Sequence, residues 1–286
     1  AGFSYNYGVY LSKTPFISPV SVTPTALLTT FKTAEELKSF LLTNSMTVTP
    51  FPFYGPLDVP QLRGMVQGFS ATESSPGLAI KYSSTNVQVA GVDELDTVKT
   101  DGEYIYTLSG TTLSILKAHP PESAEIVSRL VFDDSYPMGI FVYGDRLTVV
   151  GAKYDLQSKS YYSPGYYIIN TKTFVNVYDI AIRSSPRLIR ELTMTGSYFN
   201  SRMIDKYVYF VVSQPAYLVY DTIVLPKFYS GNQLIKEIAP TEIHYSNGSD
   251  NYFQYTTFIA INTQNTIEPP SYMTLMLGGT STMYVS

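Results

Sequence analysis

The stretch that decides the fold runs Thr85-Asn86-Val87-Gln88-Val89-Ala90-Gly91-Val92-Asp93-Glu94-Leu95-Asp96-Thr97-Val98-Lys99-Thr100-Asp101-Gly102-Glu103-Tyr104-Ile105-Tyr106. Its last part places an Asp-Gly turn directly before a strand in which aromatic and aliphatic residues alternate. A similar order returns in Met203-Ile204-Asp205-Lys206-Tyr207-Val208-Tyr209-Phe210. The interval is about two repeats of ~40–50 residues each, the length of a four-stranded β-unit. We therefore expect residues 86–286 to be built from repeated small sheets.

Short strands continue at regular intervals through this region. Turns at Ser109-Gly110 and Gly144-Asp145 predict a hairpin around each of them. The predicted strands are 104–108, 112–116, 125–130, 140–143, 147–150, 173–180, 187–194, 201–204, 207–212, 258–261 and 283–285. This regular pattern of short strands and turns indicates a mainly all-β protein made of β-propeller blades, each a set of short antiparallel strands. A β-sandwich of similar strands is the alternative.

The first 85 residues read differently and are predicted to form a separate N-terminal element. Prolines punctuate residues 1–30, which indicates extended surface chain, and residues 50–80 read as the join to the blades. Between them lies one short predicted helix, about 33–43. Thr33 and Glu36 fit a capping box, and Leu37, Phe40 and Leu41 share one helical face.

The stretch quoted above closely resembles the signature of a family of secreted bacterial and archaeal proteins whose β-propeller is distantly related to WD-40 repeats. The resemblance is carried by Thr85, Asn86, Gln88, Gly91 to Glu94, Asp96, Val98 to Gly102 and Tyr104 to Tyr106. The family is also similar in two later segments, Phe141 to Leu147 and the ending Gly278 to Ser286. The resemblance covers about residues 33–286. The resemblance implies a propeller outside the cell and no particular reaction. It further implies that the chain is the N-terminal part of a propeller, completed by a C-terminal remainder or another surface protein.

Composition restricts the classes of function. Lys and Arg number 19 and Asp and Glu 23, a net charge of −4, so a basic surface for nucleic acid is not expected. The absence of cysteine excludes disulfides and cysteine nucleophiles, and two histidines leave little for zinc chemistry. No run of ~20 apolar residues predicts a membrane span. The low charge, the 26 tyrosines and one sequon at Asn247 favour an extracellular or cell-surface glycoprotein.

Four acids are candidate metal ligands. Asp93, Glu94, Asp96 and Asp101 lie within nine residues, and Ca²⁺ takes six to eight oxygen ligands. The alternative is structural, because Asp commonly accepts hydrogen bonds from backbone amides at turns, and Lys99 is a candidate partner for one of these acids. No other cofactor is expected.

Tyrosines mark two candidate binding segments. Tyr161, Tyr162, Tyr166 and Tyr167 flank a Ser-Pro-Gly turn, where exposed rings suit glycan or protein partners. The alternative is a hairpin whose rings pack across its strands. Residues 217–229 are expected to form a long excursion between strands, either functional or covering the edge of a blade.

Two functions are consistent with these features. The first is a secreted or cell-surface propeller that binds or scaffolds other envelope molecules without catalysis. The alternative is an extracellular hydrolase with its active site at the propeller channel, using Asp93, Asp96 or Asp101. No nucleophile elbow or zinc-hydrolase motif supports the second.

Overall fold

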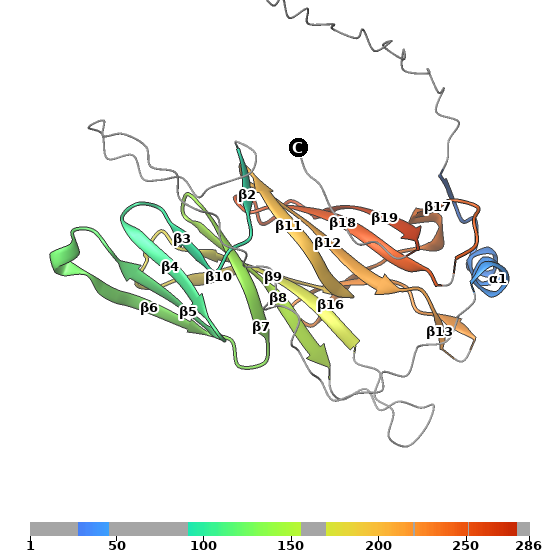
Figure 1. The fold of residues 1–286 in the computed structure, drawn as a ribbon, viewed down its shortest axis with the longest axis horizontal. Helices are drawn as coiled ribbons and strands as arrows, with labels where there is room; N and C mark the ends of the chain where they lie inside the picture. The colour runs from blue at the N-terminus through green and yellow to red at the C-terminus, as the bar shows by residue number, and fades with distance from the viewer. Residues whose placement is uncertain (1–27, 46–90, 156–169, 220, 251, 279–286) are drawn as a thin grey trace, which may run out of the picture.

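The computed structural model describes residues 28–45, 91–155, 170–219, 221–250 and 252–278 (Figure 1). Within these ranges the chain forms three four-stranded antiparallel meanders stacked side by side, and the second and third are extended by further strands at their edges. We call the meanders blades and number them in chain order. The expected fold class, mainly β with one short helix near the N-terminus, is confirmed.

Each blade runs through its strands in chain order from one edge to the other. The first blade consists of β3 (Val98–Thr100), β4 (Tyr104–Ser109), β5 (Thr112–Lys117) and β6 (Glu125–Val131). The second consists of β7 (Tyr136–Tyr143), β8 (Arg146–Asp155), β9 (Asn170–Asp179) and β10 (Arg187–Thr195). The third consists of β11 (Ser197–Ile204), β12 (Tyr207–Pro215), β18 (Gln254–Asn262) and β19 (Ser271–Leu277).

Short strands extend the second and third blades at their edges. β2 (Val92–Glu94) pairs with β11, while β17 (Ile243–Tyr245) pairs in parallel with β19 and carries β1 (Thr29–Thr30) on its far side. The chain between β12 and β18 holds a hairpin of β13 (Leu218–Val219) and β14 (Thr222–Ile223), then β15 (Lys227–Ser230) and β16 (Gln233–Glu237). Single 3-10 turns occupy Pro121–Ser123 and Pro240–Glu242.

The excursion expected after Tyr217 covers the edge of a blade. β15 pairs with β10, and β16 pairs with β15, so a segment of the third blade's chain widens the second blade to six strands. An unpaired edge strand exposes a row of backbone donors and acceptors that recruits other strands. The excursion therefore satisfies the backbone of β10 from within the same chain.

Alternating side chains bury the facing surfaces of the blades. Tyr106 and Leu108 of β4, with Leu113 and Ile115 of β5, point from the first blade into a core shared with the second. A separate core on the other face of the second blade joins it to the third. The second blade is thus buried on both faces, and consecutive residues of β8 from Leu147 to Val150 are accordingly all buried.

The helix α1 (Ala34–Asn44) begins where the sequence predicts. The backbone N–H of Glu36 donates to the Thr33 hydroxyl over 3.1 Å, which is the first half of the expected capping box. The second half differs, because the Glu36 carboxylate accepts from the backbone N–H of Lys32 at 2.6 Å instead of from that of Thr33. Among the described residues, no helix is long and apolar enough to cross a membrane.

Tertiary packing holds this short helix in place. Its buried residues Leu37, Phe40 and Leu41 belong to the core shared by the second and third blades. Phe31 stacks on Tyr245 with ring centroids 3.8 Å apart, and Phe40 meets the same tyrosine edge-on at 4.9 Å. The predicted division of the chain at residue 85 stays a prediction, because residues 46–90 lie outside the described ranges.

Candidate functional site: the cleft between the first two blades

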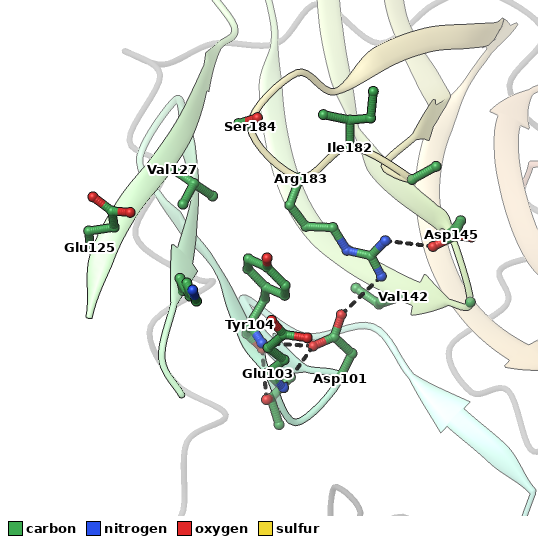
Figure 2. A pocket seen from close by; sticks show the side chains of 14 residues that line it. Asp101, Glu103, Tyr104, Glu125, Val127, Val142, Asp145, Ile182, Arg183 and Ser184 are labelled. Atoms are coloured by element: carbon green, nitrogen blue, oxygen red, sulfur yellow. Dashed lines mark hydrogen bonds and ion pairs between the residues drawn. The ribbon is translucent and has the colours of Figure 1, made fainter. Parts of the chain in front are cut away.

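A cleft of about 850 Å³ opens between the first and second blades (Figure 2). The first blade contributes the β3–β4 turn, residues 101–103, together with side chains of β4, β5 and β6. The second blade contributes the β7–β8 turn, residues 144–145, and the β9–β10 loop, residues 180–186. Turns and loops of two sheets therefore meet at one site, where polar side chains gather.

Arg183 joins the two blades at this cleft (Figure 2). Its Nη1 donates to Asp145 Oδ1 at 2.5 Å and to the carbonyl of Ile180 at 2.8 Å. Its Nη2 donates to Asp101 Oδ2 at 3.2 Å, a contact that Figure 2 also shows. Its Nε donates to the Tyr106 hydroxyl at 3.2 Å. Asp145 and Ile180 lie in the second blade, whereas Asp101 and Tyr106 lie in the first. The guanidinium thus holds the two blades together through charge-assisted hydrogen bonds.

Asp101 is committed to this network and to its own turn. One oxygen accepts the backbone N–H groups of Glu103, at 3.2 Å, and Tyr104, at 2.8 Å. The other accepts the Tyr106 hydroxyl at 2.7 Å as well as Arg183. Burial raises the pKa of Asp101, but the hydrogen bonds outweigh it and leave the pKa below its usual value. The carboxylate is therefore ionised at neutral pH, with all four contacts directed at the protein.

Tyr106 and Arg183, the side-chain partners of Asp101, both stay protonated near neutral pH. Burial raises the pKa of the Tyr106 hydroxyl, and the hydrogen bond to the Asp101 carboxylate raises it further. For Arg183, burial lowers the pKa, but the hydrogen bond to Asp145 and those to Tyr106 and Asp101 raise it above its ordinary value. Neither group can exchange a proton near neutral pH, so the network is suited to holding the blades together rather than to acid–base catalysis.

The rest of the cleft carries side chains that are available to a ligand. Within the described ranges, no hydrogen bond or ion pair engages the carboxylates of Glu103 and Glu125. Lys117 lines the same cleft, and the Tyr104 ring lies 5.7 Å from the Arg183 guanidinium. An open cleft with free carboxylates beside an aromatic ring suits hydroxyl-rich or cationic groups.

The structure separates the four acids predicted as metal ligands. Asp93 faces the core side of β2 and accepts from the buried Lys99 ammonium at 2.6 Å, which confirms Lys99 as a partner. Glu94 points to the opposite side and pairs with Arg202 at 3.2 Å. Asp101 lies beyond the far end of β3, in the cleft.

Asp96, the fourth of these acids, accepts the backbone N–H groups of Thr97 and Val98 at 2.6 and 3.4 Å. That contact, like those of Asp101, is the turn role that Asp residues commonly have. In the part of the chain that the structure describes, no cluster of three or more His, Cys, Asp and Glu side chains is placed to hold a metal ion. The Ca²⁺ hypothesis for these acids stays a prediction.

The predicted tyrosine patch cannot be placed, since Tyr161, Tyr162, Tyr166 and Tyr167 lie outside the described residues. The structure instead shows an exposed aromatic pair next to that segment in the sequence. Tyr136 and Tyr154 meet edge-on, with ring centroids 5.3 Å apart, and are 59% and 41% exposed. Asn247, the predicted glycosylation site, is exposed in the turn after β17, and its modification stays a prediction.

Sequence reasoning missed the residues that build the cleft. Arg183 stands in a loop with no motif around it, and its two acidic partners are 38 and 82 positions away. Asp145 was recognised only as a turn residue. The repeated Asp in the turn between the first two strands of each blade is the one sequence signal that points to this location.

Comparison with known proteins agrees with this architecture. The model of a family described as beta propeller domain matches residues 82–286, well over half of the chain. The chain belongs to this beta propeller domain family. This propeller is also similar to an uncharacterized protein of Methanocaldococcus jannaschii, 26% identical over 132 residues. The match covers 46% of this chain and 17% of that protein. No solved structure matches the propeller significantly.

Proposed function

We propose that this propeller is a non-catalytic binding or scaffold protein of the cell surface. The observation that carries the proposal is the commitment of Asp101, Asp145 and Arg183 to the contact between blades. These three charged groups stabilise the contact between the blades, and proton transfer by them is disfavoured. The low charge and the exposed sequon support an extracellular location.

The Tyr136–Tyr154 pair is the binding surface that we propose. Two exposed rings offer flat apolar faces with hydroxyls at their rims, a combination that suits glycans. In the sequence, Tyr154 lies shortly before the tyrosine-flanked turn that holds Tyr161 to Tyr167. The ligand class that follows is an envelope or surface-layer polysaccharide, with glycan-bearing proteins as carriers.

A glycan array and a pull-down with purified envelope polysaccharide test this function. Tyr136→Ala and Tyr154→Ala should each weaken binding about tenfold, equivalent to about 1.4 kcal/mol. Tyr143→Ala is the matched control, because Tyr143 is also 41% exposed but lies at the opposite end of β7 from Tyr136. Tyr162→Ala extends the test to the neighbouring segment. Binding that survives all of these substitutions would contradict the proposal.

A hydrolase is the second candidate, and the free carboxylates of Glu103 and Glu125 favour it. Two carboxyl groups at one cleft are the usual equipment for general acid–base hydrolysis. Peptide and glycan libraries should show turnover that Glu103→Gln or Glu125→Gln abolishes if this function is correct. Asp96→Asn tests an active site at the propeller channel, since the amide oxygen keeps the turn hydrogen bonds while the carboxylate is lost.

Calcium binding can be tested on the same variants. A ligand that binds only the folded state raises the melting temperature by an amount that grows with its concentration relative to its dissociation constant. A rise with Ca²⁺ that Asp96→Asn and Asp93→Asn abolish would assign the ion to the predicted acids. An unchanged melting temperature at millimolar Ca²⁺ would remove the metal hypothesis.

A further inference from the structure

The fourth strand of the first blade is a sheet edge, whereas the fourth strands of the other two blades are covered. β15 pairs with β10 in the second blade, and β17 pairs with β19 in the third. In the described part of the chain, β6 pairs with β5 on one side and with no strand on the other. The backbone donors and acceptors on that side of β6 are therefore available to an added strand.

The outer edges of the second and third blades are protected against strand addition. β1, the edge of the third, has only two residues, and β16, the edge of the second, carries the ion-paired side chains of Lys236 and Glu237. Short strands and charged side chains are usual means of keeping sheet edges from pairing. β6 is seven residues long, and its residues Ile126 and Val131 are 44% and 60% exposed. Of these three outer edges, β6 is the one best suited to accept a strand.

The open edge of β6 and the cleft between the first two blades form one surface. Glu125 and Val127 belong to β6 and also line the cleft (Figure 2). Tyr104, Lys117 and Glu125 are cross-strand neighbours on β4, β5 and β6, so their side chains lie in a row. Tyr104 and Val127 pack against the core shared with the second blade, which places this row on the face toward that blade. A strand added to β6 would therefore present every second side chain to the cleft.

The charges of the cleft favour a cationic group on the ligand. Four acids and two bases line it, which leaves a net charge of −2. Asp101, Asp145 and Arg183 are engaged with one another. The carboxylates of Glu103 and Glu125 have no hydrogen bond or ion pair within the described ranges. A Lys or Arg side chain that reaches either of them would make charge-assisted hydrogen bonds.

The rest of the lining favours a peptide over a bare polyamine or a sugar. The half-buried Lys117 ammonium, which has no hydrogen bond or ion pair in the described chain, would repel a polyamine but can donate to a peptide carbonyl. The opposite wall carries Val142 and Ile182, the latter 67% exposed, which suit aliphatic side chains. The Tyr104 ring, on which a sugar could stack, already contacts the Arg183 guanidinium. The lining therefore matches alternating basic and aliphatic side chains on an extended backbone.

We propose that an extended segment of a partner protein, with alternating basic and aliphatic side chains, adds to the outer edge of β6 and places a Lys or Arg beside Glu103 and Glu125. Main-chain hydrogen bonds to β6 supply the affinity, and the cleft supplies the specificity. Tyr136, of the proposed glycan surface, lies at the opposite end of β7 from the cleft residue Val142. The inference goes beyond the proposed glycan binding, and either can fail alone.

A second copy of this chain does not supply the required cation through its own β6. Arg129, the base in β6, is paired in register with Ser114 and lies on the face away from the cleft. The side chains of β6 on the cleft side are acidic, hydroxyl-bearing or aliphatic. Two β6 strands paired antiparallel about a twofold axis would turn this same face to the cleft side, so no cation would reach either cleft. Charge complementarity therefore selects a different protein.

Fluorescence anisotropy with the whole 286-residue chain tests the cleft. The probe is a labelled heptapeptide, Thr-Val-Lys-Val-Lys-Val-Thr, and its counterpart has Glu in place of both Lys residues. We expect the Lys peptide to bind about tenfold more tightly. Glu103→Gln and Glu125→Gln should each weaken its binding about fivefold. Glu122→Gln is the matched control, because Glu122 is an exposed acid of the β5–β6 turn that does not line the cleft, and it should leave binding unchanged.

Two other outcomes of this experiment would overturn the proposal. Equal binding of the two peptides, or binding of neither at millimolar concentration, would mean that the cleft does not select a basic strand. Spermidine, a polyamine without carbonyl groups, should bind more weakly than the Lys peptide, and tighter binding would mean a simple cation site. Cleavage of the bound peptide would overturn the proposal in favour of a hydrolase.

Hydrogen exchange followed by mass spectrometry tests the strand pairing. With saturating Lys peptide, amides of β6 that point away from β5 should exchange about tenfold more slowly, while those of β16, another outer edge, should not change. N-methylation of alternate peptide amides should abolish binding in one phase only, because every second N–H of an added strand faces its partner. Binding without protection of β6 would overturn the edge pairing. Protection of these amides in the isolated chain would mean that the chain covers this edge itself, and would overturn the choice of partner.

Discussion

Replacing Arg183 by Met should separate the first two blades more than any neighbouring charge substitution. Met keeps most of the apolar stem but removes the guanidinium, which contacts Asp101, Asp145, Tyr106 and the carbonyl of Ile180. The Arg183 side chain is only 18% exposed, and that of Asp101 is 22% exposed. A hydrogen bond to a charged group contributes about 1.5–3 kcal/mol, and a part-buried acceptor left without its donor adds to the loss. We expect Arg183→Met to lower the free energy of unfolding by about 2–4 kcal/mol.

Substitution of the two acidic partners of Arg183 should lower the free energy of unfolding by different amounts. This difference serves as the internal control for the Arg183→Met prediction. The Asp145 side chain is 57% exposed, so its pair with Arg183 is screened and contributes less than about 1 kcal/mol. Asp101 anchors its own turn as well as Arg183. Asp101→Asn should therefore cost more than Asp145→Asn. A double-mutant cycle between positions 183 and 101 should give a coupling energy of about 1–3 kcal/mol.

Urea unfolding followed by far-UV circular dichroism measures these values, since the chain has no Trp. With a slope of about 2–3 kcal/mol per molar urea, Arg183→Met should lower the midpoint by about 1 M. The pKa of Asp101 is lowered by folding, so its contribution is present above the ordinary aspartate value and is lost as the pH falls through the folded pKa. The effect of Arg183→Met should shrink accordingly as the pH falls below the ordinary pKa of an aspartate. A midpoint unchanged within about 0.2 M at pH 7, or an equal loss in Asp145→Asn, would refute the reasoning.

Three further predictions concern other buried positions. Folding raises the pKa of Tyr106, so its contribution to stability is complete below its ordinary pKa of about 10 and is lost as the pH rises through the folded pKa. In an absorbance titration its phenolate should appear only on unfolding, and Tyr106→Phe should reduce the component that ionises on unfolding by one tyrosine, because Tyr255 is also buried with a raised pKa. Gly151→Ala should cost about 1–3 kcal/mol or more in calorimetry, because its Cβ would lie 2.4 Å from a carbonyl oxygen and 2.5 Å from an aromatic ring, whereas Gly144→Ala meets open space and should cost about 1 kcal/mol for its positive φ. Lys99→Met should cost about 3–5 kcal/mol in urea unfolding by leaving Asp93 unpaired, and Lys99→Met with Asp93→Leu should recover part of that loss.

Patterns that depend on neighbouring residues were readable from the sequence. The strand Tyr104–Ser109, the hairpin at Gly144-Asp145 and the helix cap at Thr33 all appear as predicted, because alternation, turn chemistry and capping act over two to four residues. The strands β15, β16 and β19 were not predicted. β19 is apolar on both faces and lacks alternation, while β15 and β16 exist because the edge of β10 is available to pair with them.

For the candidate site, too, the sequence indicated which acids are neighbours in the chain but not which partners they contact. The sequence placed Asp93 to Asp101 together, but a strand turns successive side chains to opposite faces, so Asp93 and Glu94 separate and meet Lys99 and Arg202 instead. Arg183 carried no local signal, since the reason for its position is an acid 82 residues away.

The sequence by itself determined that this protein consists mainly of short β-strands joined by turns, several of which carry an Asp, because periodicity and turn chemistry act over a few residues. The preference for propeller blades over a β-sandwich came with the resemblance to a known family. Only the tertiary structure decided which acids are engaged and which remain open. Arg183 donates hydrogen bonds to Asp101 and Asp145, whereas the exposed carboxylate of Asp205 has no hydrogen bond or ion pair in the described part of the chain. The physical reason is that contacts between blades join residues distant in the chain, and their partners are fixed by how the sheets stack.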